Sequence, residues 1–385
     1  MKKEILFCLL AIILFNQSAL CGRGFAPLKP KQIRLDTKTK WEVKPSFMLD
    51  TLCFLNVLTG DPFYLRFYKN EYDVFEPQLT PAARLALANL KRKIKDDNKD
   101  IISASLTLYF SVTRDQNLDD LLKTVKDSRE MKQKLKRTVY YTDEKWQMYE
   151  SVRDDLRVIF SFLKDIHFED YWKQNYLPNI ERKIAQIKPD LPKYNVVSEV
   201  ENLLGYRLSS NKITAYILHF PKPHGIRVTG LRFIMSDSDP FKTTVFIAVH
   251  ESMHPPFDLK RDAELKNALD TLRADEFLMD KVKNHNPSLG YNTFEGLVEE
   301  DCVQSLDQII SEKLGVEIME AHKRWKHYDE GIHVLAVALY SLMKQENFDG
   351  RHEKFREFLL RMLRSGKLSA GKIKPLYDDF YSSKI

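Results

Sequence analysis

The residues best suited to bind a metal or take part in catalysis lie in the stretch VFIAVHESMHPPF, Val245 to Phe257. Within it, His250, Glu251 and His254 have the i, i+1, i+4 spacing with which a helix binds zinc through two imidazoles and holds a carboxylate beside the metal. The rest of this helix is mostly apolar, and buried ionisable groups cost several kcal/mol unless they are paired or bound to a metal. The stretch therefore predicts a zinc site in which Glu251 is the general base.

A catalytic zinc ion takes three protein ligands and keeps one position open for water, so a third ligand must come from elsewhere. The downstream stretch YNTFEGLVEEDCVQSLDQIISEKLG offers Glu295, Glu299 and Glu300. Helical phase places the first two near the centre of an apolar stripe and Glu300 at its edge, where a ligand can face a cleft. We expect Glu300 as the third ligand, keep Glu295 as a close alternative, and expect a remaining carboxylate to orient a histidine. Acidic residues also gather in first turns because the helix dipole favours them there, so this cluster alone does not indicate a metal site.

Hydrolysis also needs a hydrogen-bond donor for the oxyanion besides the metal. Tyr291, just before the acidic stretch, and His333, in YDEGIHVLAVALYSLM, are the candidates. A structural role is the alternative for each of them.

The elements that must position these residues change in character along the chain. Residues 46–195 have mostly helical patterns, as in TPAARLALANLKRKIK, where Thr80 caps a helix and Pro81 opens it. IISASLTLYFSV in the same region is apolar on most sides and is either a buried helix or a strand. Further on, β-branched and aromatic residues at 212–220 and 225–237 predict a strand pair or a small sheet.

The helix that carries the motif is delimited on both sides. Asp239 is expected to cap it. Pro255 and Pro256 end it, because proline lacks the backbone N–H and disfavours helix in the residue before it. His254 is then the last helical residue, and a charged helix over about residues 258–283 and further helices follow.

The predicted order of elements resembles that of zincin metallopeptidases with a glutamate as third ligand. In this order, strands precede a helix that carries the motif, and an intervening segment leads to a second helix with an acidic start. The resemblance covers about residues 196–315 and rests on HESMH, the strands before it and the acidic helix after it. It implies an α+β, mostly helical fold, with a zincin-like catalytic domain at residues 196–385 after a helical region at 46–195. It also implies one Zn²⁺ ion held by His250, His254 and a glutamate.

Two resemblances compete within the acidic stretch. EGLVEE resembles the glutamate-glycine pair of zinc aminopeptidases and would make Glu295 the ligand, whereas EEDCVQSL resembles a longer-spaced form and favours Glu300. A strand within residues 225–237 is expected to pair with an extended peptide substrate. The proline pair after the motif shortens the predicted active-site helix. The geometry of the substrate pocket in zincins whose helix continues is therefore not carried over to this chain.

The N-terminus, MKKEILFCLLAIILFNQSALCGRG, has two lysines and then a core of about eleven apolar residues. Such a core is too short to span a membrane and is typical of a secretory signal, which we place at residues 1–21. Acylation of Cys21 is the alternative, and it is the only route by which we expect membrane attachment. Both outcomes export the chain to the periplasm or the medium. Residues 22–45, rich in Lys, Pro and Arg, are expected to form an extended linker.

Composition limits the other classes of function. The chain of 385 residues is 43% hydrophobic and 30% charged, as folded soluble proteins are. Its net charge of +6 is spread among acids, and the basic clusters lack interleaved aromatics, so no nucleic-acid partner is expected. Cys53 and Cys302 remain after the signal and are expected to be buried thiols, with a single disulfide as the alternative.

These expectations combine in an exported zinc metallopeptidase that acts on a peptide or protein substrate. The alternative is a non-enzymatic envelope or binding protein that retains a zincin-like fold. Glu251 favours the enzyme, because a scaffold has no need of a general base beside the metal. A zinc hydrolase acting on a non-peptide amide is a third interpretation, which the sequence does not separate from the first.

Overall fold

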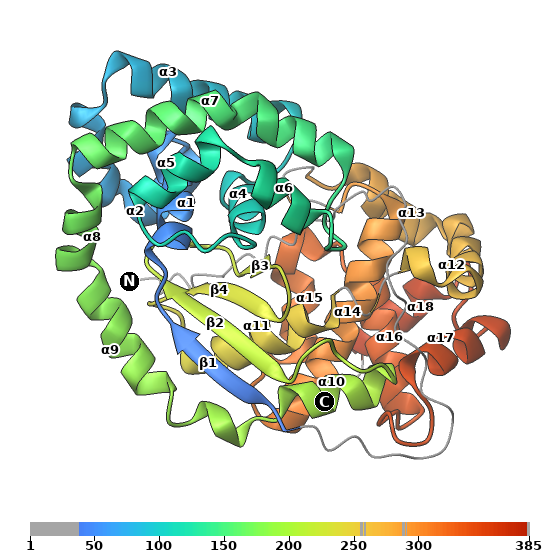
Figure 1. Cartoon of the computed structure of the whole chain (residues 1–385). Helices are drawn as coiled ribbons and strands as arrows, with labels where there is room; N and C mark the ends of the chain where they lie inside the picture. The colour runs from blue at the N-terminus through green and yellow to red at the C-terminus, as the bar shows by residue number, and fades with distance from the viewer. Residues whose placement is uncertain (1–37, 255–256, 258, 287–288, 290, 383–385) are drawn as a thin grey trace, which may run out of the picture. The chain divides into compact units, whose positions relative to one another are not determined.

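A computed structural model of the chain describes residues 38–254, 257, 259–286, 289 and 291–382. The predicted signal peptide (residues 1–21), Cys21 and the linker as far as residue 37 lie outside the described residues. The fold is α+β and mostly helical with one small sheet, which confirms the predicted class (Figure 1). Within the described ranges, no helix combines the length and the apolar character needed to span a bilayer.

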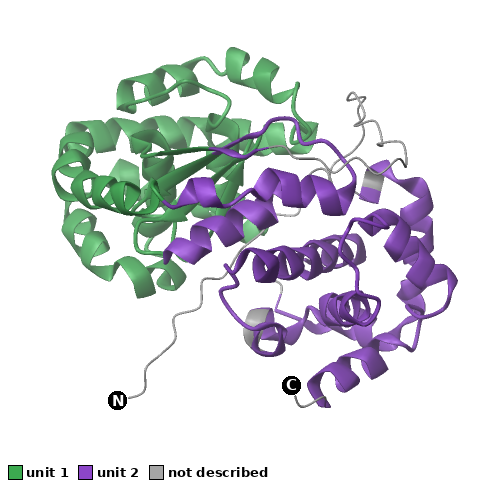
Figure 2. Cartoon of the chain, turned by 90° about the horizontal axis from the view of Figure 1, so that it is seen from below, with its two compact units in different colours: residues 1–22, 41–189, 214–239 green, residues 23–40, 190–213, 240–385 purple. Residues whose placement is uncertain are grey.

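The chain forms two compact units (Figure 2). Among the described residues, unit 1 comprises residues 41–189 and 214–239, and unit 2 comprises residues 38–40, 190–213 and 240–382. This division differs from the predicted boundary at residue 195, because residues 214–239 group with the N-terminal helices and not with the helix that carries HESMH.

Unit 1 consists of the sheet and a set of helices that precede most of it in the sequence. Two of these helices are buried along their whole length, α1 and α4, so IISASLTLYFSV is a helix and not a strand. Thr80 caps α3 by accepting a hydrogen bond from the Ala83 N–H at 3.2 Å, as predicted. The helices are α1 (Phe47–Leu58), α2 (Pro62–Phe75), α3 (Pro81–Lys91), α4 (Ile102–Phe110), α5 (Leu118–Lys126), α6 (Arg129–Leu135), α7 (Asp143–Asp165), α8 (Phe168–Asn175) and α9 (Leu177–Ile187).

The sheet has the strand order β1-β2-β4-β3. Its strands are β1 (Lys40–Lys44), β2 (Lys212–Leu218), β3 (Ile226–Val228) and β4 (Arg232–Ser236). Strand β2 runs parallel to β4, and β3 pairs antiparallel with β4. The sequence predicted one strand over residues 225–237, but Gly230, with φ at +76°, turns the chain there and divides the stretch into β3 and β4.

Strand β1 corrects the predicted linker, which was expected to run to residue 45. In KWEVK the apolar residues Trp41 and Val43 alternate with charged ones, which is the two-residue period of a strand. The Thr214 hydroxyl of β2 donates a hydrogen bond to the Glu42 carboxylate of β1 at 2.9 Å. The linker prediction is therefore wrong for residues 40–44.

Polar side chains tie the carboxyl end of β2 to the helices of unit 1. His219 Nε2 lies 3.2 Å from Glu71 Oε1, and its Nδ1 lies 3.4 Å from Asp237 Oδ2. Burial by itself lowers the pKa of His219, but the Asp237 and Glu71 carboxylates outweigh it and raise the pKa to about 9. The buried Asp50 carboxylate of α1 accepts hydrogen bonds from the backbone N–H groups of His219 and Phe220.

Unit 2 is helical apart from its short contributions to β1 and β2. The charged helix predicted over about residues 258–283 is two helices, because Asp275 begins a new one by accepting a hydrogen bond from the Leu278 N–H at 2.9 Å. Cys302 and, in unit 1, Cys53 are buried free thiols. The helices are α10 (Val196–Leu204), α11 (Phe241–Met253), α12 (Ala263–Asp270), α13 (Glu276–Asn284), α14 (Phe294–Leu314), α15 (Ala321–His327), α16 (Val334–Gln345), α17 (Phe355–Arg364) and α18 (Ile373–Ser382). Helix α14 packs against α10, α11 and α16.

Candidate metal centre

Helix α11 carries the HESMH motif at its C-terminal end. Its residues from Thr243 onward are all buried, and the exposed fractions are 1% for His250 and 5% for Glu251. The helix ends at Met253, and His254 follows as the C-cap with an extended backbone, so the predicted end is one residue late. His250 therefore lies in the last turn of the helix and His254 at its C-cap.

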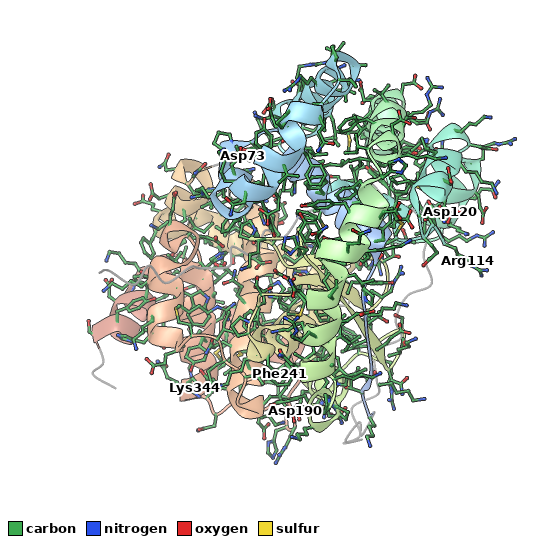
Figure 3. All side chains as sticks on the ribbon, turned by 90° about the vertical axis from the view of Figure 1, so that its left-hand side faces the viewer. Asp73, Arg114, Asp120, Asp190, Phe241 and Lys344 are labelled. Carbon is green, nitrogen blue, oxygen red and sulfur yellow. The ribbon has the colours of Figure 1, made fainter. Side chains whose placement is uncertain are left out.

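The start of α11 also differs from the prediction. Pro240 is the N-cap residue and the helix begins at Phe241, which is labelled in Figure 3. The centroid of the Phe241 ring lies 5.6 Å from that of the Tyr194 ring. Asp239 was expected to cap the helix, but its carboxylate accepts a hydrogen bond from the Ser236 N–H at 3.0 Å. It therefore stabilises the turn after β4 and not the helix.

Helix α14 presents a line of buried polar side chains. The Thr293 hydroxyl caps its start by accepting a hydrogen bond from the Gly296 N–H at 3.2 Å. Most of the side chains that follow are buried, both apolar and polar. The buried polar residues that recur every three or four positions along one face are Glu300, Gln304, Asp307 and Ser311. Because buried polar groups need partners, this line indicates where α14 meets other polar groups or a ligand.

Atoms of three ionisable side chains converge between α11 and α14. His250 Nε2 lies 3.8 Å from Glu300 Oε1, and His254 Nε2 lies 3.6 Å from Glu300 Oε2. One potential ligand atom from each residue lies within 4.8 Å of the other two. In the described part of the chain, this is the group of His, Cys, Asp and Glu side chains that could hold a metal ion.

The atoms that converge have no other partner. His250 Nε2, His254 Nε2 and Glu300 Oε2 are buried and make no hydrogen bond. Leaving one buried polar atom unsatisfied costs about 1–3 kcal/mol, and more when it is charged. A cation that accepts a lone pair from each of the three would satisfy all of them at once.

Neighbouring side chains orient the ligand atoms. The Nδ1 atom of His250 lies 2.7 Å from Asp307 Oδ2, and with the proton on Nδ1 the lone pair is left on Nε2. The Gln304 side-chain amide donates a hydrogen bond to Glu300 Oε1 at 2.9 Å, which leaves Oε2 as the free carboxylate atom. The carboxylate that orients His250 is therefore Asp307 and not, as predicted, one of the acidic candidates that remain beside Glu300. Glu300 is arranged to bind through one oxygen.

Charges in the group favour an ionised carboxylate. Burial by itself raises the pKa of Glu300, but the charges of His250 and His254 outweigh it and lower the pKa to about 2. Burial likewise lowers the pKa of His250, whereas the carboxylates of Glu300, Asp307 and Glu251 raise it above its ordinary value. Metal ligation requires neutral imidazoles, so zinc binding to this group would release any proton that the ligand nitrogens carry.

The other acidic candidates of α14 lie away from this group. The Glu295 side chain is 36% exposed, and its Oε1 lies 2.6 Å from Arg273 Nη2 and 3.8 Å from Lys266 Nζ. Glu299 is half-buried and does not belong to the group. The helical phase inferred from the sequence was wrong, because it placed Glu295 in the buried stripe. Five residues before Glu300, it points about 140° away from that side chain.

The two predicted oxyanion donors pack against each other. His333 is fully buried, with Nδ1 2.6 Å from Asp301 Oδ1 and Nε2 3.0 Å from Asp329 Oδ2. Burial lowers its pKa, but the two carboxylates outweigh this effect and raise it to about 10. Tyr291 is 2% exposed, and its ring meets that of His333 edge-on with centroids 5.4 Å apart. Because carboxylates hold both of its nitrogens, His333 has a structural role, and the geometry gives no support to Tyr291 as an oxyanion donor.

Sequence reasoning missed three residues that support the ligands. Gln304 and Asp307 follow Glu300 by four and seven positions on the same face of α14. This spacing of polar residues on an otherwise apolar helix was a signal that could have identified both, and Glu300 with them. Arg324 of α15 donates hydrogen bonds to both oxygens of Asp307. No local pattern marks it, because its role depends on how α15 packs.

The donor set fits zinc. Two imidazole nitrogens and one carboxylate oxygen form one of the ligand sets of catalytic zinc sites. Tetrahedral zinc with bonds of about 2.0–2.1 Å places its ligand atoms roughly 3.4 Å apart. The distance of 3.6 Å between His254 Nε2 and Glu300 Oε2 is within a few tenths of an ångström of this value, and the three ligand atoms lie within 4.8 Å of one another. Among the described side chains, none forms a hydrogen bond with the carboxylate of Glu251, next to His250.

In comparisons with known proteins, no family model, no curated protein and no solved structure matches the chain. Its function must therefore be argued from the site itself.

Proposed function

We propose that the chain is an exported zinc-dependent metallopeptidase whose metal is held by His250, His254 and Glu300. The observation that carries the proposal is the convergence of three buried ligand atoms without partners. Histidine pairs inside proteins normally find hydrogen-bond partners, so three unsatisfied atoms around one point favour a cation there. The general-base residue that such an enzyme needs, Glu251, directly follows the first ligand.

Zinc bound at this point would lower the pKa of a coordinated water towards 7 and polarise a substrate carbonyl. Glu251 would accept the proton of the attacking water on its carboxylate and donate it to the amine that leaves. Asp307 keeps the proton of His250 on Nδ1, so that Nε2 offers its lone pair. Gln304 holds one oxygen of Glu300, which favours ligation through a single oxygen.

Two further features support a zincin-like enzyme. The ligands come from the end of one helix and from the second turn of a later one, and a small mixed sheet precedes both in the sequence. The sequence of the N-terminus favours export, where a peptidase meets peptide substrates outside the cytoplasm.

The variant Glu251→Gln tests this proposal, with Glu295→Gln as the matched control because Glu295 lies on the surface of the same unit. Both proteins and the parent are loaded with zinc and incubated with a peptide library, and cleavage is read by mass spectrometry. We expect Glu251→Gln to keep zinc and to lose about 100- to 10,000-fold in turnover, which is the usual contribution of a general base. We expect Glu295→Gln to resemble the parent.

Unchanged hydrolysis by Glu251→Gln would refute the assigned mechanism. A parent protein that binds zinc at the site and cleaves no peptide would refute peptide bonds as its substrate. That result would favour the non-enzymatic binding protein.

A further inference from the structure

Helix α15 contacts the supports of two proposed metal ligands from outside the site. Arg324 donates to Asp307, which holds His250, and the neighbouring Trp325 donates to Gln304. We propose that Arg324 is a positioning residue that acts on His250 through Asp307 and sets the affinity for the metal. This inference rests on the metal centre proposed above.

Arg324 and Asp307 form a buried, bidentate contact. The Arg324 side chain is 4% exposed and that of Asp307 is fully buried. Nη2 donates to Oδ2 at 3.0 Å and Nη1 donates to Oδ1. Nη1 also donates to Gln308 Oε1 at 3.1 Å. The guanidinium fork thus fixes the plane of the carboxylate, which a single point charge does not do.

The same guanidinium is held in place from α11. Its carbon lies 5.0 Å from the ring centroid of Phe246 and 5.3 Å from that of Trp325. Phe246 stands one helical turn before His250. Arg324 therefore contacts the helix that carries His250, in addition to the carboxylate that orients this histidine.

The arrangement explains why Asp307 can hold His250 in a fixed orientation. A lone buried carboxylate is free to turn toward other donors. The guanidinium holds both oxygens in a fixed plane, so Oδ2 stays directed at the His250 Nδ1–H. The imidazole is then presented to the metal with Nε2 foremost, and little rotational freedom remains to be lost on ligation.

A parallel contact reaches the third ligand. The Trp325 indole N–H donates to Gln304 Oε1 at 2.9 Å, which fixes the Gln304 amide with its NH₂ group toward Glu300 Oε1. Two consecutive residues of α15 thus hold the supports of two ligands. This repetition favours positioning over an incidental buried ion pair.

The test compares zinc dissociation constants, measured by competition with a chromogenic chelator, for the full chain and Arg324→Met. Removing a group that orients a ligand typically weakens metal binding 10- to 100-fold, and we expect this loss. Arg356→Met is the control, because Arg356 also forms ion pairs within unit 2, with Asp262 and Glu264, away from the ligands. We expect it to bind zinc like the parent. Arg324→Lys, which keeps the charge without the fork, should lie between the two.

A second readout separates positioning from a general loss of stability. In the zinc-loaded chain with labelled histidines, the Nδ1–H proton of His250 should exchange with solvent faster in Arg324→Met than in the parent. If Arg324→Met does not fold, Arg324→Lys becomes the test variant, because it keeps a positive charge beside Asp307 and removes the bidentate contact. Parent-like zinc affinity in a folded variant overturns the role of Arg324 while the metal site stands. A parent that binds no zinc overturns the proposed function itself.

Discussion

Replacing Glu300 by glutamine tests which acidic residue of α14 completes the proposed site. Its Oε2 lies 3.6 Å from His254 Nε2 and has no other partner. Structural zinc sites with four protein ligands bind with about 10–16 kcal/mol, so one ligand contributes roughly 2.5–4 kcal/mol. At 1.4 kcal/mol per factor of ten, Glu300→Gln should weaken zinc binding about 100- to 1,000-fold. Chelator competition measures the constant, and circular dichroism verifies the fold.

The control on the same helix is Glu295→Gln. Glu295 forms an exposed ion pair with Arg273, a kind of contact that contributes about 0–1 kcal/mol to stability. We expect its zinc affinity to equal that of the parent. Equal losses in the two variants, or a loss confined to Glu295→Gln, would refute the reasoning from the unpartnered atoms.

Three further predictions concern stability, each measured by urea denaturation. First, the raised pKa of His219 contributes stability that is complete below about pH 6.5 and is lost as the pH rises through about 9. The free energy of unfolding should fall by at most about 3 kcal/mol over this window in the parent and not in His219→Gln. Second, Asp301→Ala leaves His333 without one of its two buried carboxylates and should cost about 3–5 kcal/mol. A cost below about 1 kcal/mol would contradict that role. Third, Thr80→Ala removes the cap of α3 and should cost about 1 kcal/mol, whereas Thr80→Ser should be nearly neutral.

The part of the site that depends on local geometry could be predicted from the sequence. The spacing of His250 and His254 fixes their common side of a helix, wherever that helix packs. The class of fold could also be predicted, because the helical and alternating patterns of apolar residues are local in the sequence. Glu300 was chosen from an acidic stretch by its phase, yet the phase of Glu295 was misjudged. The polar residues at 304 and 307, which share the face of Glu300, were not counted as part of the pattern.

The rest depends on packing that no short pattern encodes. Arg324 contributes to the candidate site only because α15 lies against α14, and a buried arginine looks like any surface arginine in the sequence. The carboxylates of Asp301 and Asp329 that hold His333 could not be assigned to it from the sequence, because they approach it from other turns of the chain. The division into compact units differs from the predicted domain boundary because residues 214–239 make their contacts with the N-terminal helices, although they come later in the sequence.

The zinc content of the purified chain from Gly22 onward, compared with that of the double variant His250→Ala, His254→Ala, decides whether the proposed metal centre exists. We expect close to one zinc ion per chain in the parent and none in the folded double variant. Zinc that persists in the double variant, or a folded parent that takes up none, would refute the proposed site.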